Sequence, residues 1–365
     1  MNPISVIWNS VRPTRPLSDL VEMQRVLPIR IAQSLLNGPM GGRNSDFKIR
    51  LEHLLARFES DSLSRSWENP EIYPALIGML NSSDEVDWRY HLSVLELQTG
   101  NFRDFSSLPD GVYRIGFPEF GVVSVRSDNV EELSGQLFFR VNDKPTYHVY
   151  PRAGLFTKLV GADLYPEEES GGAAGIQIED FVRCAWGILD SYDSSLTGDL
   201  ASSISRIVLT PDFGDDIRWS YSLRLRYLSG IFINPYRVNR HGFVESMIHE
   251  YCHQRLWLWW SFDPLDGITD NGRQVISPVT GRRRSLAVMF HALLIYIAVE
   301  DFYRHCLAEE EMPVVERDWC VERHKHLGKA LPELYSRLTG CIDQESIGGR
   351  VLQRIWLGSQ VEIQN

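Results

Sequence analysis

The amino-acid sequence predicts an α+β fold, because strands and helices follow one another along it without regular alternation. Three observations indicate this class. Apolar residues recur at spacings of three and four through the first hundred residues, short β-branched and aromatic runs begin near Gly111, and long apolar helical segments occupy the last third. A chain of 365 residues is long enough to bury a large core and to form two or three domains.

The N-terminal region is predicted to be helical first and β-rich afterwards. Helical periodicity runs through residues 17–36, 46–60 and 70–83. The predicted strands form a small sheet, are bounded by Gly, Pro, Asn and Asp, and lie at 111–117, 121–127, 135–142 and 147–152.

A predicted linker follows at residues 165–175, whose sequence YPEEESGGAAG has no apolar periodicity. The linker divides the chain into an N-terminal region, residues 1–165, and a C-terminal domain, residues 176–365. Three roles remain open for the N-terminal region, namely peptide recognition, binding of a carrier protein, or only packing against the rest of the chain, and its sequence matches no pattern that chooses among them.

The C-terminal domain is predicted to begin with one helix, to continue with strands and to end with helices. Its expected elements are, in chain order, a helix at 178–193, a strand at 204–211, one or two strands within 220–235, a helix that carries His249 and His253, a loop at 263–281, a very apolar helix from near Ser285, and one or two C-terminal helices.

Composition excludes several classes of partner and location. The 37 basic and 48 acidic residues give a net charge of −11, which disfavours nucleic acid and anionic membranes as primary partners. The five cysteines contain no C-x-x-C pair, which indicates a reducing compartment and no disulfide framework. No apolar run near the N-terminus is long enough for a signal peptide, and the run at 286–299 is too short to span a bilayer. We therefore expect a cytoplasmic protein.

The segment MIHEYCHQRLWLWW, residues 247–260, contains the motif H-E-x-x-H. His249 and His253 are four residues apart on a predicted helix, so both imidazoles project from one face and can meet one ion at roughly 2 Å each. Glu250 lies about 100° around the helix, where zinc hydrolases place the carboxylate that takes a proton from metal-bound water. The strand-like segment SGIFIN shortly before the motif is typical of zincin folds, in which an edge strand runs beside the active-site helix. The alternative is that both histidines are structural.

The third metal ligand is not part of this motif. The metzincin extension requires Gly at 256 and His at 259, and Leu256 and Trp259 exclude it. Glu300, in the following helix, and Asp263, ten residues after His253, are candidates of the glutamate and aspartate types, but neither has the companion motif of its class.

His291 is the preferred third ligand. It interrupts LAVMFHALLIYIAV, in which almost every other residue is apolar, so we expect the helix to be buried all round. A buried imidazole must be hydrogen-bonded or coordinated to offset its desolvation, and an H-E-x-x-H short of one ligand favours coordination over a satisfied core histidine. Glu300 follows His291 by nine residues, about 900°, so the two face opposite ways and cannot share an ion.

Arg284 precedes His291 by seven residues, about 700°, which is about 20° off the same helix face. A guanidinium near a metal suits a co-substrate with two carboxylates, because its fork takes the distal carboxylate while the metal holds the other end. Arg282 and Arg283 lie about 200° and 100° away on the wheel and should face elsewhere. The alternative is that Arg284 is one solvated member of the run GRRR.

At these residues the sequence resembles the HExxH-motif peptide-modifying proteins of ribosomal natural-product clusters, described as α-ketoglutarate-dependent HExxH-type peptide β-hydroxylases. The similarity covers roughly residues 200–340 and runs through GIFINP, ESMIHEYCHQRLWL, the Asp-Pro of FDPLDG, SPVTGRRRSLAVMFHALLIYIAV and LPELYSRLTGCI. The spacing of Arg284, Leu286 and His291 is its most specific part. Ser285 stands where the pattern has proline, and Val288 stands where it has a small residue.

The resemblance implies a non-haem iron oxygenase on a zincin-like scaffold. Fe(II) would be held by His249, His253 and His291, with α-ketoglutarate and O₂ as co-substrates and a precursor peptide as the substrate, hydroxylated on a side-chain carbon, usually β. Most iron oxygenases use two histidines and one carboxylate, so a third histidine is a departure. Glu250 would orient a ligand or the substrate.

Two other functions remain open at this point. The first is a zinc metallopeptidase in which His249 and His253 bind zinc, Glu250 is the general base, and Glu300 or Asp263 is the third ligand. The second is a catalytically silent peptide-binding module that keeps the motif as a structural metal site.

Overall fold

The computed structural model describes most of the C-terminal half of the chain and separate segments of the N-terminal half. The described residues are 29–37, 45–58, 76, 79, 92, 111–114, 122–126, 129–132, 137–139, 146–149, 178–204, 206–210, 219–222, 230–262, 268, 273–309 and 312–363. This part of the chain is mostly helical with three small sheets, which confirms the predicted α+β class. The chain divides into two compact units, one of Met1–Leu20, Asp180–Leu200 and Val238–Asn365, the other of Val21–Glu179 and Ala201–Arg237.

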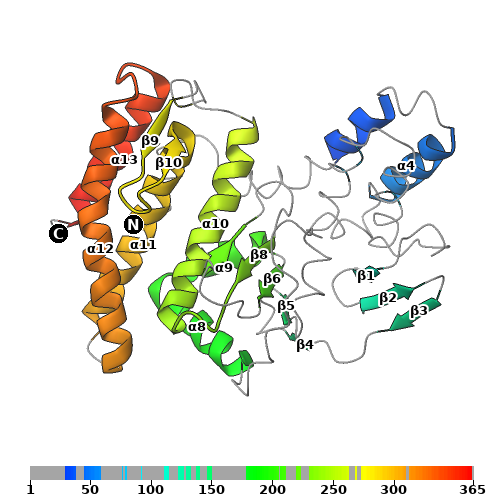
Figure 1. Ribbon diagram of the computed structural model, residues 1–365, viewed down its shortest axis with the longest axis horizontal. Helices are drawn as coiled ribbons and strands as arrows, with labels where there is room; N and C mark the ends of the chain where they lie inside the picture. Colours follow the sequence, from blue (N-terminus) through cyan, green and yellow to red (C-terminus); the bar gives the residue numbers. More distant parts are fainter. Residues whose placement is uncertain are drawn as a thin grey trace. The chain divides into compact units, whose positions relative to one another are not determined.

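The second unit holds two of the sheets and helix α4 (Ser45–Phe58), which confirms the helix predicted at 46–60 (Figure 1). The smaller sheet is antiparallel, in the order β1–β2–β3, with strands Gly111–Arg114, Val122–Arg126 and Asn129–Glu132. The larger sheet has the order β4–β5–β6–β8–β7, with strands Leu137–Phe139, Thr146–Val149, Arg206–Leu209, Gly230–Ile233 and Ser220–Tyr221.

The larger sheet is mixed. Strands β5, β6 and β8 are parallel, and β4 and β7 add antiparallel edges. All four residues of β8 are buried, as are Ile207, Val208 and Leu209 of β6, which is typical of strands covered on both faces. The strand of SGIFIN is therefore internal, and the expectation that it forms an edge is wrong because β7 pairs along its outer side.

Strands from both sides of the predicted linker meet in this sheet, since β5 pairs with β6. The linker at 165–175 lies outside the described residues, so the division into 1–165 and 176–365 stays a prediction.

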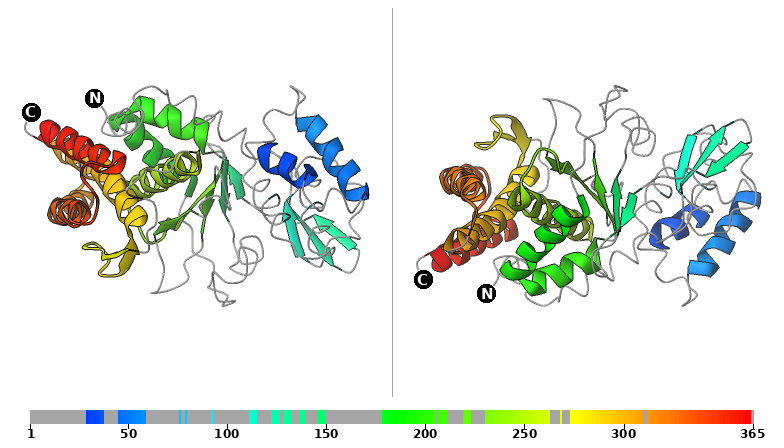
Figure 2. Two further views of the ribbon diagram at one scale, coloured as in Figure 1. Left: turned by 90° about the horizontal axis from the view of Figure 1, so that it is seen from above. Right: turned by 90° about the horizontal axis from the view of Figure 1, so that it is seen from below.

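The first unit is built from helices. Helices α8 and α9 (Ile178–Tyr192 and Ser194–Ser203) lead into it, and it continues through α10, α11, α12 and α13, with bounds Arg240–Phe262, Leu286–Ala308, Val314–Thr339 and Ile347–Ile363 (Figures 1 and 2). Helix α11 contacts α10, α12 and α13. The long helices and the two C-terminal helices were predicted from the sequence, whereas α9 was not.

Helix α11 is apolar on all sides. Its first residue follows Ser285, whose side-chain oxygen accepts a hydrogen bond from the backbone N–H of Val288 and so caps the helix. No residue from Leu286 to Glu300 is exposed, which confirms the prediction of a helix buried all round. The helix extends to Ala308 and is longer than the apolar run at 286–299 suggested. It is the one described helix that is long and apolar enough to cross a bilayer, but 67% of its most apolar window is buried inside the protein, as in a core helix.

A short hairpin precedes α11 where a loop was predicted. Strands β9 (Gln274–Ile276) and β10 (Arg283–Ser285) pair antiparallel, and the Ser277 N–H donates to the Arg282 carbonyl at 2.9 Å to close the turn. Gly281 has a φ of 66°, a left-handed conformation that a residue without Cβ adopts at little cost. The periodicity of two such short strands is too brief to be read from the sequence.

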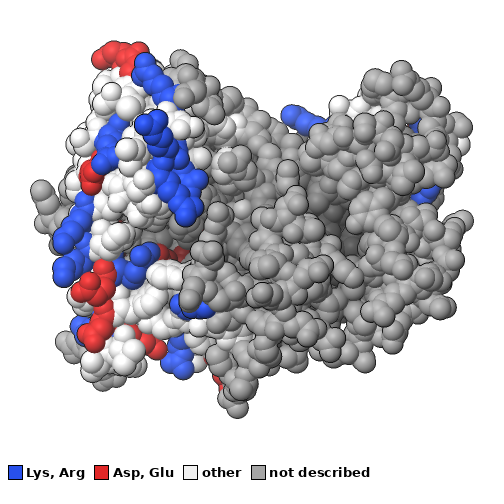
Figure 3. Space-filling model, in the orientation of Figure 1, with Lys and Arg blue, Asp and Glu red and all other residues white. Residues whose placement is uncertain are grey.

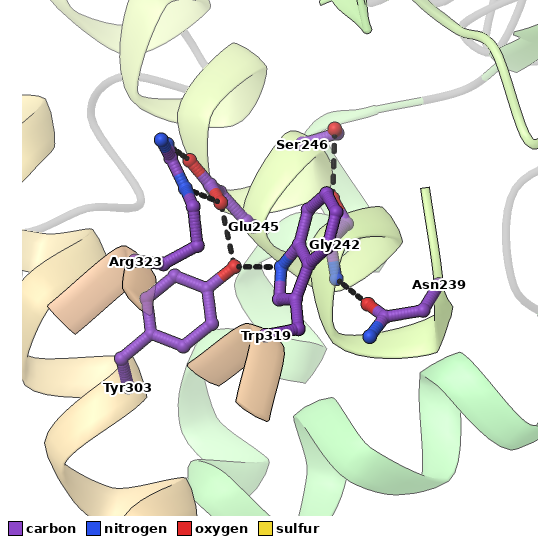
Figure 4. Close-up of polar contacts among 7 residues, drawn as sticks. All are labelled: Asn239, Gly242, Glu245, Ser246, Tyr303, Trp319 and Arg323. Atoms are coloured by element: carbon purple, nitrogen blue, oxygen red, sulfur yellow. Dashed lines mark hydrogen bonds and ion pairs between the residues drawn. The ribbon is translucent and has the colours of Figure 1, made fainter. Parts of the chain in front are cut away.

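A buried polar network joins α10, α11 and α12 (Figure 4). Glu245 of α10 is 4% exposed and accepts hydrogen bonds from the Tyr303 hydroxyl at 2.6 Å and from Arg323 Nε at 3.0 Å. A second nitrogen of Arg323, Nη2, donates to the other carboxylate oxygen. Trp319 Nε1 donates to the Tyr303 hydroxyl at 3.1 Å. Burial raises the pKa of Tyr303 well above its usual value of 10, with a further increase from Glu245, so the phenol keeps the proton that it donates.

The network also fixes how closely two helices approach. The indole of Trp319 lies 3.0 Å from the position that a Cβ on Gly242 would occupy, so α12 packs directly on the backbone of α10. Gly242 N–H donates to the side-chain oxygen of Asn239 at 2.8 Å, which caps the start of α10. Helix α10 is thus held at its first turn and at Glu245, one helical turn before His249.

We predict that Arg323→Met destabilises the protein by about 3–5 kcal/mol, because it leaves the Glu245 carboxylate buried without its cationic partner. Urea unfolding monitored by circular dichroism measures the change in the free energy of unfolding. The control is Lys325→Met on the same helix, where Lys325 and Glu322 form an exposed pair and the expected cost is about 1 kcal/mol or less. Equal losses for the two variants would contradict a structural role for this network.

Candidate metal centre

The motif helix α10 presents its two histidines together. The rings of His249 and His253 meet edge to face with centroids 4.9 Å apart, as the spacing of four predicts. Both histidines are half-buried, whereas Met247 and Ile248 are fully buried and anchor the helix in the core. Trp257 continues the same spacing and stacks on His253, with ring centroids 6.3 Å apart and an interplanar angle of 14°.

His291 of α11 lies against this face of α10. Its side chain is 1% exposed, and its ring centroid is 6.3 Å from that of His253. Two indoles flank it in edge-to-face contacts, Trp257 at 4.6 Å and Trp260 at 5.1 Å. The structure therefore brings the three histidines that the sequence singled out to neighbouring positions on two packed helices.

Ring spacing tests whether this set fits one ion. Two imidazoles that bind an ion at a tetrahedral angle have centroids roughly 5 Å apart, because each nitrogen lies about 2 Å from the metal. His249 and His253 match that spacing, and His253 and His291 are about 1 Å farther apart. Within the described part of the chain, no three His, Cys, Asp or Glu side chains already converge to hold a metal. The spacing of His249 and His253 is compatible with one shared ion, whereas the spacing of His253 and His291 exceeds it.

Glu300 faces a different helix from His291. Its Oε1 lies 3.0 Å from Nε2 of His324 on α12, and its Oε2 lies 4.0 Å from Arg304. His291 contacts α10 instead, so the two residues of α11 lie on different sides, as the helical wheel predicted. Asp263, the other carboxylate candidate, lies outside the described residues.

Glu250 is 2% exposed, so the carboxylate of the motif lies inside the protein. Tyr296 of α11 lies on the same side of the site, with its ring centroid 6.0 Å from that of His249. Burial is the main cause that raises the pKa of Tyr296, and the negative charge of Glu250 contributes in the same direction. Glu250 is therefore within electrostatic reach of a phenol that contacts a candidate ligand.

Arg284 is not on the helix, and the helical-wheel argument for its position is wrong. Helix α11 begins at Leu286, and Arg284 lies in β10 opposite Val275 of β9. Because side chains alternate along a strand, Arg284 is half-buried while Arg283 is exposed. The positive charge of Arg284 lowers the pKa of Tyr296, so the guanidinium lies within electrostatic reach of the phenol next to His249. Arg282 and Arg283 are exposed, as predicted.

Three residues of this site were not predicted from the sequence: Trp257, Trp260 and Tyr296. Trp257 could have been found, because it extends the stripe of His249 and His253 by four more residues. Tyr296 carried no signal, because it is one of many large apolar residues in α11. Its importance appears only when charges from α10, α12 and β10 are found around it.

We predict that His291→Leu weakens Fe(II) or Zn(II) binding by more than about 100-fold, because it removes a ligand nitrogen at nearly constant volume. Equilibrium dialysis of the full chain with added metal measures the affinity, and unfolding without metal checks that the core survives. Glu300→Gln, on the same helix but facing His324, should bind metal as the unmodified protein does. Loss of metal in Glu300→Gln with retention in His291→Leu would assign the third ligand to the carboxylate.

Comparison of the sequence with protein families and with curated proteins identifies no relative. No protein-family model matches the chain, and a search of curated proteins finds no match. What the site does is therefore inferred from its own residues.

Proposed function

We propose that this protein is an Fe(II)- and α-ketoglutarate-dependent dioxygenase on a zincin-like scaffold. It hydroxylates side-chain β-carbons of a ribosomally made precursor peptide. In this proposal His249, His253 and His291 hold Fe(II), and Arg284 binds the distal carboxylate of α-ketoglutarate. The observation that carries it is that the buried imidazole of His291 lies beside His253 of the H-E-x-x-H pair.

The donor set is compatible with iron. Imidazole suits both Zn and Fe, so three histidines alone do not select between these metals. Bound iron with its α-ketoglutarate and O₂ supplies oxidising power that no side chain has. The protein holds the ligands in place, and Trp257 and Trp260 surround His291 with apolar surface that excludes water. A dry surrounding favours oxidation of the substrate over side reactions with solvent.

Tyr296 lies among charges of both signs, with Glu245 and Glu250 on α10, Arg323 on α12 and Arg284 on β10 within electrostatic reach of the phenol. Because Arg323 donates hydrogen bonds to Glu245, the proposal assigns the anion to Arg284. Since burial raises the pKa of Tyr296, the phenol is protonated at neutral pH and can donate a hydrogen bond. A guanidinium and a phenol donor on the His249 side suit the carboxylate of a co-substrate that also chelates the metal.

A zinc metallopeptidase is the second candidate, and the burial of Glu250 next to His249 favours it. A desolvated carboxylate beside a metal-bound water is the arrangement that peptide hydrolysis requires. This candidate needs a third ligand other than His291. Glu300 is paired with His324, so the role would pass to Asp263.

We predict that Arg284→Ala raises the Kd for α-ketoglutarate roughly a hundredfold, because truncating a desolvated bidentate ion pair typically costs a few kcal/mol. Anaerobic calorimetry on the full chain loaded with Fe(II) measures this affinity. Arg354→Ala, an exposed arginine of α13, is the charge-matched control and should bind α-ketoglutarate normally. If the unmodified protein loaded with Fe(II) shows no α-ketoglutarate binding, the oxygenase proposal fails and the peptidase takes its place.

Glu250→Gln separates the two chemistries. Hydrolysis needs a general base, so a peptidase with this change should lose turnover by a factor of about 10² or more while it keeps its metal. An oxygenase should keep a substantial part of its succinate formation, because Glu250 then only orients its neighbours. Co-expression with small peptide genes that neighbour this one, read by mass spectrometry, gives the product: one added oxygen per site for hydroxylation, shorter fragments for cleavage. The catalytically silent module predicts neither.

A further inference from the structure

The segment that precedes the His291 helix is strongly basic in an acidic protein. Between residues 271 and 299 there is no Asp or Glu, and four arginines, Arg273, Arg282, Arg283 and Arg284, fall in this segment, while the whole chain carries −11. Arg273, Arg282 and Arg283 are exposed. Figure 3 shows Lys and Arg side chains over the region of β9 and β10, whereas Lys and Arg are mixed with Asp and Glu along α12. A local positive field of this kind attracts an anionic partner.

The hairpin leaves one backbone edge open. The hydrogen bond from Ser277 N–H to the Arg282 carbonyl fixes the ladder, so Val275 and Arg284 form the next hydrogen-bonded pair. Ile276 and Arg283 lie between these pairs, and their backbone N–H and C=O groups therefore point outward. Among the described strands, β10 pairs with β9 alone.

The two edges of the hairpin differ. The outer edge of β9 is occupied, because Arg337 of α12 donates from Nη1 to the Ile276 carbonyl at 2.6 Å. The outer edge of β10 offers the N–H and C=O of Arg283. An exposed edge of this kind binds an extended segment through main-chain hydrogen bonds.

Side-chain alternation sets the chemistry that this edge would recognise. The outer face of the hairpin carries Arg283 and Ile276, the latter 47% exposed, and the inner face carries the half-buried Val275 and Arg284. Within the described part of the chain, no carboxylate forms an ion pair with Arg282 or Arg283. A strand laid along β10 would therefore meet the exposed guanidinium of Arg283 on the outer face, with Arg282 directly before the start of β10, and these charges suit acidic residues in the docked segment.

We propose that the outer edge of β10 docks an extended acidic segment of a peptide, paired as an additional strand. The proposal rests on the proposed function, in that the docked segment belongs to the precursor peptide and not to another protein. Strand β10 passes through Ser285 directly into the helix that carries His291. A peptide docked there is held at the start of that helix, and the residues beyond the docked segment can extend toward the candidate metal centre.

The contributions of the arginine charges and of the backbone hydrogen bonds to peptide affinity can be tested separately. Fluorescence anisotropy measures this affinity on the full chain without Fe(II) or α-ketoglutarate. The probes are a labelled extended peptide of alternating Glu and Val, its Lys–Val counterpart of equal length, and a single-stranded oligonucleotide. The unmodified protein should bind the acidic peptide, more weakly as salt rises, and should not bind the Lys–Val peptide. The double variant Arg282→Glu/Arg283→Glu should lose roughly tenfold or more in affinity. Arg354→Glu on α13, which makes a charge change at another exposed site, should lose little.

A backbone variant tests the strand pairing. Arg283→Pro removes the charge and the outward N–H, while Arg283→Gln removes only the charge. Because that N–H is not part of the β9–β10 ladder, the hairpin should survive in both variants, and Arg283→Pro should bind the acidic peptide more weakly than Arg283→Gln. Equal affinities would contradict strand pairing.

Other outcomes of these assays would overturn the proposal. They are an equal loss for Arg354→Glu, binding of the oligonucleotide at least as tight as that of the peptide, or no binding of the acidic peptide. Since the assay contains neither metal nor co-substrate, loss of docking and loss of α-ketoglutarate binding are independent results.

Discussion

The position of the candidate metal centre depends on one buried carboxylate. Glu245 lies one turn before His249 on α10 and holds Tyr303 of α11 and Arg323 of α12 by hydrogen bonds. A carboxylate removed from water must be compensated on both oxygens, so the three helices can approach only in an arrangement that presents these donors together. This arrangement also sets α11 against α10 and hence His291 against His253. The donors to Glu245 thus position the histidines without touching them.

Much of the helical part of this fold could be predicted from the sequence, because its signal is local. Helix α8 repeats its apolar residues at helical spacing, α10 carries the motif H-E-x-x-H, and α11 is a continuous apolar run that begins directly after its N-cap Ser285. The hairpin could not be predicted in the same way. Its strands are three residues long, and β10 contains two arginines. The outer edge of β9 is stabilised by Arg337, which is 61 residues away from Ile276 in the chain. The Glu245–Arg323 pair, 78 residues apart, is non-local in the same sense.

The candidate site shows the same division between local and non-local information. The spacing of four placed His249 and His253 on one face, and the desolvation cost of an imidazole singled out His291 in an apolar helix. The position of Arg284 was derived from helical geometry, and that geometry does not apply to a strand. Its alternation with Arg283 along β10 leaves Arg284 half-buried, while Arg283 is exposed. Tyr296 has no motif, since its environment is made by charges on three other elements.

The junction between β10 and α11 has a mechanical consequence. Ser285 is both the last residue of the strand and the cap of the helix, so no loop residue separates the two elements. A loop would absorb a displacement of one end through its own backbone torsions. This junction contains no loop residues that could do so. A shift of β10 along its axis must therefore appear as a rotation or translation of the first turns of α11, where His291 is the sixth residue. Binding of a peptide strand to β10 would therefore be coupled, through this direct junction, to the distance between His291 and the histidine pair.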